Sequence, residues 1–217
     1  MDKNLTIKMS IAVLAILYAV GAVGIAFRLV PGLAALTSLH LFISFLFLVY
    51  WHEKKGVFFW LWLMIAYLIG TLVEYLGVQY GFLFGSYEYG ANMRPVVAGT
   101  PIIIGINWII LSYCFTRIVA RWAPRKFSMF VIAAISATLM TAFDVLIEPV
   151  AIELNFWSWE KGYVPLTNYA GWWIVSLILN FLFVKMGVEN GRNPIAFWVL
   201  LFQLFFFVFV YVFRVIA

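Results

Sequence analysis

The sequence predicts an all-α integral membrane protein of about seven transmembrane helices, with the N-terminus inside and the C-terminus outside. Three observations lead to this prediction: the composition, the spacing of apolar runs, and the distribution of basic residues between those runs. Of the 217 residues, 66% are hydrophobic and only 11% are charged, with a mean hydropathy of +1.04. Soluble domains are about 45–50% apolar and about 25% charged, so this composition excludes an ordinary soluble domain.

Seven apolar runs are each long enough to cross the hydrocarbon core of a bilayer, which takes about 20 helical residues. Two of the connections between them are long, 77–100 and 149–168, and both are rich in polar and aromatic residues. We expect the whole chain, residues 1–217, to form a single transmembrane helical domain. The predicted spans are 7–27, 33–51, 57–76, 101–120, 127–148, 169–187 and 195–213.

Basic residues gather on the side of these spans that carries the N-terminus. Cytoplasmic connections of membrane proteins hold an excess of lysine and arginine, so that side should be cytoplasmic and both long connections should lie outside. This bias explains the net charge of +5 without a nucleic-acid partner. The predicted inner residues are Lys3, Lys8, Lys54, Lys55, Arg117, Arg121, Arg125, Lys126, Lys185 and Arg192, and the outer ones are Arg28, Arg94, Lys161 and Arg214.

The few cysteines and histidines exclude several classes of protein. Cys114 is the single cysteine, which excludes an internal disulfide framework. His40 and His52 are too few for a histidine-rich di-iron membrane oxidase, and neither has a second ligand three or four residues away. We interpret both as satisfied core or interfacial histidines. The first apolar run is long enough to span and lacks a small-residue cleavage site, so we expect no cleavable signal peptide.

Aromatic residues make up 20% of the chain. Interfacial belts and lipid-facing phenylalanines account for many of them, especially in the last span. The remainder suggests a cavity walled with rings, which would suit a flat, long, apolar ligand or a transient cation.

The segment 143–173 places acids and indoles together between apolar sequences. Asp144 and Glu148 are four residues apart, so a helix presents both carboxylates on one face, about 6 Å from each other. Pro149 should end that helix, which puts the acids in its last turn. If the pair is poorly hydrated, the two carboxyl groups would share protons and act as a general acid. Alternatively, the pair lies at the interface, partly exposed, and titrates in the ordinary way. The acids and tryptophans of the segment are Asp144, Glu148, Glu153, Glu160, Trp157, Trp159, Trp172 and Trp173.

Glu74 lies near the outer end of the third span. A carboxylate within a span costs about 2.5–3.5 kcal/mol at mid-membrane, so it normally has a function or a partner. Glycines at 77, 81 and 85 follow it at intervals of four residues. As helix they would form a small-residue packing face, and as loop they would let the backbone approach a ligand.

Polar groups elsewhere in the spans also need partners. Asn107 must find hydrogen bonds for its amide and Trp108 an acceptor for its indole N–H. Asn107 would hold a water, orient a carboxylate from the third or fifth span, or make an interhelical hydrogen bond that fixes packing. Asn168 and the tryptophans after it would line the same mouth as the acids.

Five motifs, taken in order, resemble one known family. They are EYLGVQYGFLFGSYEY at 74–89, PIIIGINW at 101–108, DVLIEP at 144–149, WSW at 157–159 and GYVPLTNYAGW at 162–172. Together they resemble the bacterial carotenoid biosynthesis family, which contains the carotenoid 1,2-hydratases (gamma-carotene 1'-hydroxylases) and the hydratases of C50 carotenoids. The chain has Glu148-Pro149 where that family usually has Asp-Pro.

The resemblance implies addition of water to the terminal C=C of a linear (psi) carotenoid end group, giving a tertiary alcohol. It also implies a lipid-soluble carotenoid substrate, surrounding membrane lipid, and a place in the bacterial cytoplasmic membrane with the site toward the outer side. The chemistry needs a proton from Asp144 or Glu74, a cation stabilised by aromatic faces, and a base such as Glu148, but no redox cofactor and no metal. The expected catalytic residues are Asp144, Glu74 and Glu148, and the expected substrate contacts are Asn107, Trp108, Tyr87, Trp157, Trp159, Asn168 and Trp172.

Two alternatives remain at the level of the sequence. A cyclase or isomerase would use the same protonation but lose a proton instead of adding water. A non-enzymatic carotenoid-binding or transport protein would use the aromatic cavity without the acids. A retinal-type photoreceptor is disfavoured because no lysine lies midway along the last span.

Overall fold

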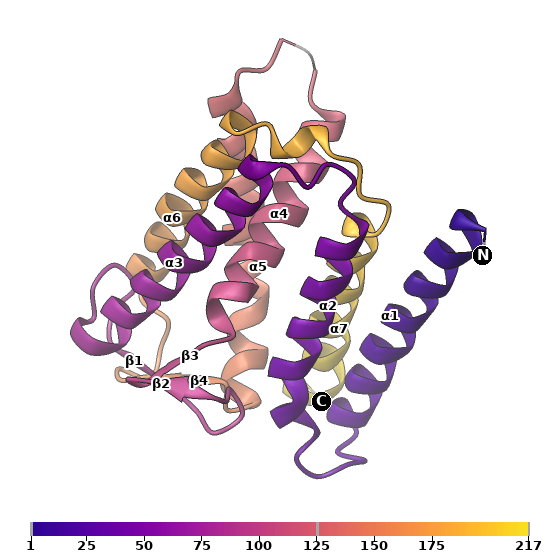
Figure 1. The fold of residues 1–217 in the computed structure, drawn as a ribbon. Helices are drawn as coiled ribbons and strands as arrows, with labels where there is room; N and C mark the ends of the chain where they lie inside the picture. Colours follow the sequence, from indigo (N-terminus) through magenta and orange to yellow (C-terminus); the bar gives the residue numbers. More distant parts are fainter. Residues whose placement is uncertain (1, 125, 217) are drawn as a thin grey trace.

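The computed structural model describes residues 2–124 and 126–216, and their main elements are seven α-helices (Figure 1). Two short 3₁₀ turns, η1 (Leu33–Leu36) and η2 (Val188–Asn190), precede the second and the seventh helix. A π-helical turn, η3 (Tyr211–Ile216), extends the seventh helix. The helices are α1 (Lys3–Ala26), α2 (Thr37–Trp51), α3 (Val57–Tyr80), α4 (Ile104–Trp122), α5 (Met129–Glu153), α6 (Leu166–Lys185) and α7 (Ala196–Val210).

Six of these helical segments are long and apolar enough to cross a membrane, which confirms the predicted class of all-α membrane protein. The remaining helix, α4, is the one that its neighbours cover most completely. It packs against α2, α3, α5, α6 and α7, and the stretch 108–116 is buried without interruption. Because protein rather than lipid surrounds it, α4 carries more polar side chains than the outer helices. The crossing by a seventh span stays a prediction.

The helices run alternately up and down, and the C-terminal end lies at the end of the bundle that carries the strands (Figure 1). The N-terminal end of α1 lies away from that end. The predicted spans agree with the helices to within a few residues at each boundary. Arg125, one of the basic residues assigned to the inner side, lies outside the described residues.

Four short strands hold the two long connections together at one end of the bundle. They are β1 (Tyr87–Tyr89), β2 (Val96–Val97), β3 (Thr100–Pro101) and β4 (Trp157–Trp159). The strand β1 pairs antiparallel with β4, whereas β2 pairs with β3. In the first pair Tyr87 lies opposite Trp159 and Tyr89 opposite Trp157. Two connections that are about 70 residues apart in the chain therefore form one ribbon.

The prediction that Pro149 ends its helix is wrong, because α5 continues through it to Glu153. Proline removes one backbone donor, but a helix packed among others can keep its course past a proline. The residues just after it, Val150 and Ala151, are fully buried and so anchor the continued turn. Glu148 and Asp144 consequently lie about one and a half and two and a half turns before the helix end, inside the bundle.

Candidate functional site

Glu74 is buried on α3 and accepts three hydrogen bonds. The hydroxyls of Tyr87 and Tyr89 both donate to Oε2, each over 2.6 Å, and the indole Nε1–H of Trp108 donates to Oε1 over 2.9 Å. The donors come from β1 and from α4, so this carboxyl group joins three elements. The acceptor that the Trp108 indole needs is therefore Glu74.

The close approach of Tyr87 to α3 depends on Gly77. A Cβ atom on this glycine would lie 2.8 Å from the Tyr87 hydroxyl oxygen, closer than such contacts allow. The next glycines serve a different purpose, because Gly81 ends α3 with a φ of +62° and Gly85 has a φ of +100° in the following loop. Gly77 is thus a packing position on the helix, whereas Gly81 and Gly85 allow left-handed turns; approach of the loop backbone to a ligand stays a prediction.

Asp144 and Glu148 form a second acidic group on α5, and both are buried, with exposed fractions of 0% and 3%. The Asn168 side-chain amide on α6 donates to Asp144 Oδ2 over 2.8 Å and to Glu148 Oε1 over 3.2 Å. Asp144 Oδ1 is buried and has no hydrogen-bond partner within the described part of the chain. The pair is therefore an interior one and is not exposed at the surface.

Glu148 Oε2 accepts two further hydrogen bonds from the ribbon. The indole N–H groups of Trp157 and Trp159 donate to it over 3.0 and 2.9 Å. Alternate residues of a strand point to the same face, so Tyr87 and Tyr89 share one face of the ribbon with these tryptophans. One ribbon face consequently presents two hydroxyls to Glu74 and two indoles to Glu148.

The tyrosines remain hydrogen-bond donors over a wide range of pH. Burial raises the pKa of Tyr87 and Tyr89 well above the usual value, and the neighbouring Glu74 carboxylate raises it further. Both hydroxyls therefore stay protonated and keep donating to Glu74.

A small cavity of about 30 Å³ lies between Glu74 and Glu148. About 10–15 Å³ of such space is enough for one water molecule, so the cavity has room for only a few. Trp172 lines it and stacks on Trp108, with ring centroids 4.3 Å apart and planes inclined by 24°. The cavity is lined by Glu74, Phe84, Tyr87, Tyr89, Ile104, Asn107, Ile147, Glu148, Trp157, Trp159, Asn168 and Trp172.

The structure thus places most of the sequence-predicted site residues around one cavity. Asp144 and Trp108 do not line it, but each makes a hydrogen bond to a residue that does. Tyr89 was not expected as a site residue, although it stands two positions from Tyr87 and a strand would place both on one face. The apolar wall residues, such as Ile147, carried no signal that separates them from lipid-facing residues.

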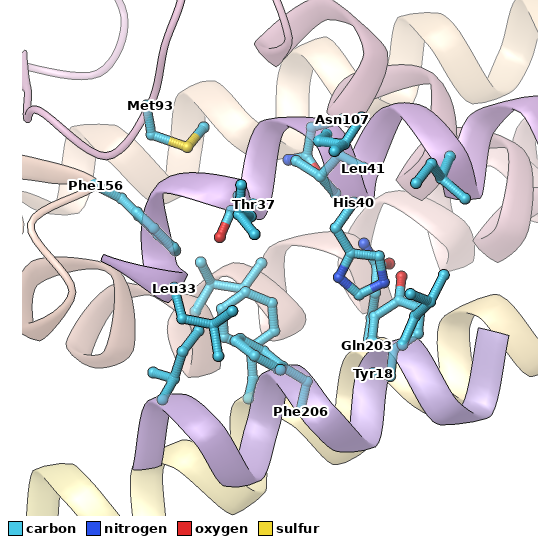
Figure 2. Close-up of a pocket in the computed structure, with 18 of the residues that line it drawn as sticks. Tyr18, Leu33, Thr37, His40, Leu41, Met93, Asn107, Phe156, Gln203 and Phe206 are labelled. Atoms are coloured by element: carbon cyan, nitrogen blue, oxygen red, sulfur yellow. The ribbon is translucent and has the colours of Figure 1, made fainter. Parts of the chain in front are cut away.

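A larger, mostly apolar cavity of about 260 Å³ adjoins the small one (Figure 2). The two share Ile104, Asn107, Ile147 and Trp157 in their walls. The amide of Asn107 faces both cavities and makes no side-chain hydrogen bond to any described residue. The rest of the large cavity is lined chiefly by α1, α2 and α7, which the sequence analysis did not connect with the site.

The large cavity opens on the outer surface of the bundle. Three of its lining residues, Val20, Leu36 and Leu39, are more than half exposed. All three are apolar and belong to segments that are long and apolar enough to cross a membrane. The opening therefore faces the region that lipid would occupy.

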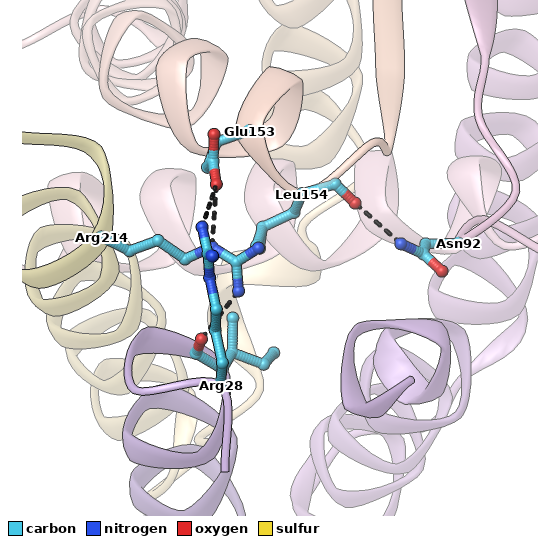
Figure 3. A network of polar contacts seen from close by, with 6 residues as sticks. Arg28, Asn92, Glu153, Leu154 and Arg214 are labelled. Carbon is cyan, nitrogen blue, oxygen red and sulfur yellow. Dashed lines mark hydrogen bonds and ion pairs between the residues drawn. The ribbon is translucent and has the colours of Figure 1, made fainter. Parts of the chain in front are cut away.

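Three of the residues singled out in the 143–173 segment lie away from this site. Trp173 donates to the Thr138 hydroxyl on the outer side of α5 and α6, and Glu160 is exposed. Glu153 accepts a hydrogen bond from Arg214 Nε over 3.0 Å and lies 3.8 Å from an Arg28 guanidinium nitrogen (Figure 3). These charges join the ends of α1, α5 and η3.

The two histidines differ. His52 agrees with the prediction of a satisfied core histidine, because its ring nitrogens contact the Tyr113 hydroxyl over 2.7 Å and the Lys54 carbonyl over 3.1 Å. The same prediction is wrong for His40, whose Nε2 is buried without a partner among the described residues. The His40 ring packs edge-on against Tyr18 of α1, with ring centroids 4.0 Å apart, but His40 also lines the large cavity, where no described side chain reaches Nε2 (Figure 2).

Fold and site together define a membrane protein with a buried acidic centre beside an apolar cavity. The carotenoid biosynthesis protein family matches residues 32–217, and the chain belongs to this family. The chain is similar to the bisanhydrobacterioruberin hydratase of Haloarcula japonica, with 26% identity over 142 residues, which cover 58% of this chain and 46% of that protein. The chain thus matches about half the length of that relative. No solved structure matches it.

Proposed function

We propose that the protein is a hydratase that adds water to the terminal C=C of a linear carotenoid end group by acid catalysis. The observation that carries this proposal is that Glu74 and Glu148, from different helices, line one small cavity whose wall continues into an apolar cavity open to lipid. Membership in the carotenoid biosynthesis family and similarity to a protein named as a hydratase support it.

The large cavity suits one end of a long apolar chain. Sites that enclose a whole drug-sized ligand typically measure about 300–1,000 Å³, so about 260 Å³ holds an end group while the remainder stays in the bilayer. The exposed rim at Val20, Leu36 and Leu39 provides lateral entry from lipid. The double bond would reach the acids past Asn107 and Trp157.

We assign the proton to the Asp144–Glu148 pair. An ionised Asp144 would leave Oδ1 buried without any donor, whereas a protonated carboxyl group avoids that cost. Asp144 does not line the cavity, so its proton would reach the alkene through Glu148. Transfer forms a C–H bond at the less substituted carbon and leaves a tertiary cation.

Aromatic faces then stabilise the cation. The rings of Trp157, Trp159 and Trp172 line the small cavity, and a cation within about 6 Å of a ring centroid is attracted to its face. The first two rings are held in orientation by their hydrogen bonds to Glu148, and the third by stacking on Trp108. Such preorganised groups cost no reorganisation during the reaction.

We propose Glu74 as the base. Its three hydrogen-bond donors favour the ionised carboxylate over the protonated acid. Water in the small cavity, held by the Asn107 amide, forms the C–O bond and loses a proton to Glu74. The proton gained by the alkene equals the proton lost by water, and once the proton on Glu74 returns to the Asp144–Glu148 pair through water, the net change is addition of one water. This assignment exchanges the roles of Glu74 and Glu148 relative to the expectation from sequence.

The test is expression in cells that make lycopene or gamma-carotene, followed by mass analysis of their pigments. A product heavier by one water supports the hydratase. A product of unchanged mass with a new ring or shifted double bond would instead identify a cyclase or isomerase. Pigment that copurifies unaltered with the wild type would indicate a binding protein. Glu88→Gln is the matched control, since Glu88 is an exposed acid on the other face of the same strand.

A further inference from the structure

A second polar group lies in the large cavity, away from the acids. Gln203 stands in the middle of α7, where every other side chain is apolar, and it is only 3% exposed. His40 on α2 lines the same cavity, and neither residue lines the acidic one. Figure 2 shows both side chains directed into the cavity beside Tyr18.

Each of these side chains has a buried polar atom that no described residue satisfies. Gln203 Oε1 and His40 Nε2 are buried and have no hydrogen-bond partner in residues 2–124 and 126–216. By contrast, the neighbouring Tyr18 hydroxyl is already hydrogen-bonded to Ser44 Oγ over 3.2 Å. Buried polar atoms normally have partners, and an amide within an apolar helix destabilises the protein unless something binds to it.

The chemistry of the two groups specifies the missing partner. A side-chain amide and a neutral imidazole each contain one group that donates hydrogen bonds and one atom that accepts them. A hydroxyl group can donate to one and accept from the other, which a pure hydrocarbon cannot do. The surrounding wall is apolar, so the hydroxyl must belong to a molecule that is otherwise apolar.

We propose that His40 and Gln203 form a subsite for a hydroxyl group carried by the isoprenoid chain that occupies the large cavity. This inference rests on the proposed function for the identity of the chain as a carotenoid end, but not for the existence of the subsite. The hydroxyl binds between α2 and α7 while the double bond extends past Asn107 toward the acids. The subsite therefore selects hydroxylated chains and sets how far each chain enters.

The experiment measures binding without any reaction. Purified protein in detergent is titrated with geranyllinalool, an acyclic isoprenoid tertiary alcohol, and with the matched hydrocarbon that lacks the hydroxyl. Binding is followed by quenching or shift of tryptophan fluorescence and by the ligand-dependent rise in Tm. We expect the wild type to bind the alcohol roughly tenfold more tightly, the effect of about one buried hydrogen bond.

The variants Gln203→Met and His40→Phe should bind the alcohol and the hydrocarbon equally, within about twofold, while hydrocarbon affinity stays near that of the wild type. Phe206→Leu, in the same cavity and on the same helix, is the matched control and should weaken both ligands alike. Equal affinity of the wild type for both ligands would mean that the polar atoms hold water only, and this would overturn the proposal even if no variant folds. A preference that survives in both variants would overturn it as well.

The outcome is separable from the proposed hydration. If the wild type hydrates no carotenoid but loses its preference for the alcohol in the two variants, the subsite stands and the hydratase fails. If it hydrates lycopene but shows no preference, the hydratase stands and the subsite fails.

Discussion

Tyr87 and Trp159 lie directly opposite each other in the β1–β4 ribbon, with ring centroids 5.1 Å apart. The Tyr87 hydroxyl donates to Glu74 on α3, and the Trp159 indole donates to Glu148 on α5. One cross-strand pair thus links two acids that both line the small cavity. The positions of the two carboxyl groups therefore depend on each other through the ribbon.

Asp144→Asn should abolish hydration while leaving the fold in place. Asparagine keeps an oxygen that can accept from Asn168 but carries no acidic proton. General acid–base groups contribute roughly 10²–10⁴-fold to rate, so we expect a loss of that size in hydrated carotenoid formed per amount of protein. Glu88→Gln should retain wild-type product. Product from Asp144→Asn at the wild-type level would exclude Asp144 from proton delivery.

Tyr89→Phe should destabilise the protein, because it leaves Glu74 with one donor fewer in a buried place. A hydrogen bond to a charged group contributes about 1.5–3 kcal/mol, and each kcal/mol shifts Tm by about 2–4 °C in a chain of this length. Thermal unfolding in detergent measures the change. The comparison variant is Tyr80→Phe, since Tyr80 is 73% exposed at the end of α3. Equal Tm values for the two variants would contradict the role assigned to Tyr89.

Gly77→Ala should displace Tyr87 from Glu74. The added methyl group would lie 2.8 Å from the Tyr87 hydroxyl, and overpacking of this kind costs about 1–3 kcal/mol. We expect lower stability together with lower hydration, since the ribbon carries donors for both acids. Gly21→Ala on α1 is the stability control, because its nearest neighbour would lie 3.7 Å away. If Gly77→Ala has the same Tm as Gly21→Ala and keeps full activity, the close approach of Tyr87 to α3 is not required.

Leu39→Trp should obstruct the lateral opening. Leu39 is 54% exposed and lines the large cavity, so a larger side chain there fills the rim without entering the core. We expect kcat/KM for a carotenoid to fall roughly tenfold or more while Tm stays near the wild-type value. Leu68→Trp provides the control, since Leu68 is similarly exposed on α3 and lines neither cavity. Equal activity of both variants would place substrate entry elsewhere.

His52 should make stability depend on pH. Burial, together with the positive charges of Arg117 and Lys55, lowers the pKa of His52 from 6.5 to about 4. As the pH falls, His52 therefore takes up a proton at about pH 6.5 in the unfolded chain but only at about pH 4 in the folded protein. The free energy of unfolding should then be unaffected by this group above pH 6.5 and should decrease as the pH falls toward 4. Thermal unfolding across this range should show a smaller pH dependence in His52→Gln. The same slope in variant and wild type would contradict the assignment.

The helices could be predicted from sequence because a bilayer imposes their length and their apolar surface. Pro149 misled that prediction, since proline weakens a helix locally but α5 is held by packing on both sides of it. The β1–β4 ribbon could not be predicted, because three-residue strands have no detectable periodicity and their partners are far apart in the chain.

The acids of the candidate site could be found from sequence because a carboxylate in an apolar segment is costly and therefore conspicuous. Their donors were only partly found, since Tyr89 becomes informative only when β1 is known to be a strand. An apolar cavity was expected from the aromatic content, but its position against α1, α2 and α7 was not. Its walls on α1, α2 and α7 have the composition of lipid-facing surface, and nothing in one helix shows that its neighbour leaves a space.

The ribbon covers the acidic cavity at the end of the bundle, while the large cavity opens sideways toward lipid. For the proposed reaction, the two reactants would arrive by separate routes, the hydrophobic one from the bilayer and the aqueous one past the ribbon. The small cavity has room for only a few water molecules beside the place where a carbocation would form. A water molecule held in contact with the cation would favour addition over loss of a proton, and therefore the alcohol over elimination products.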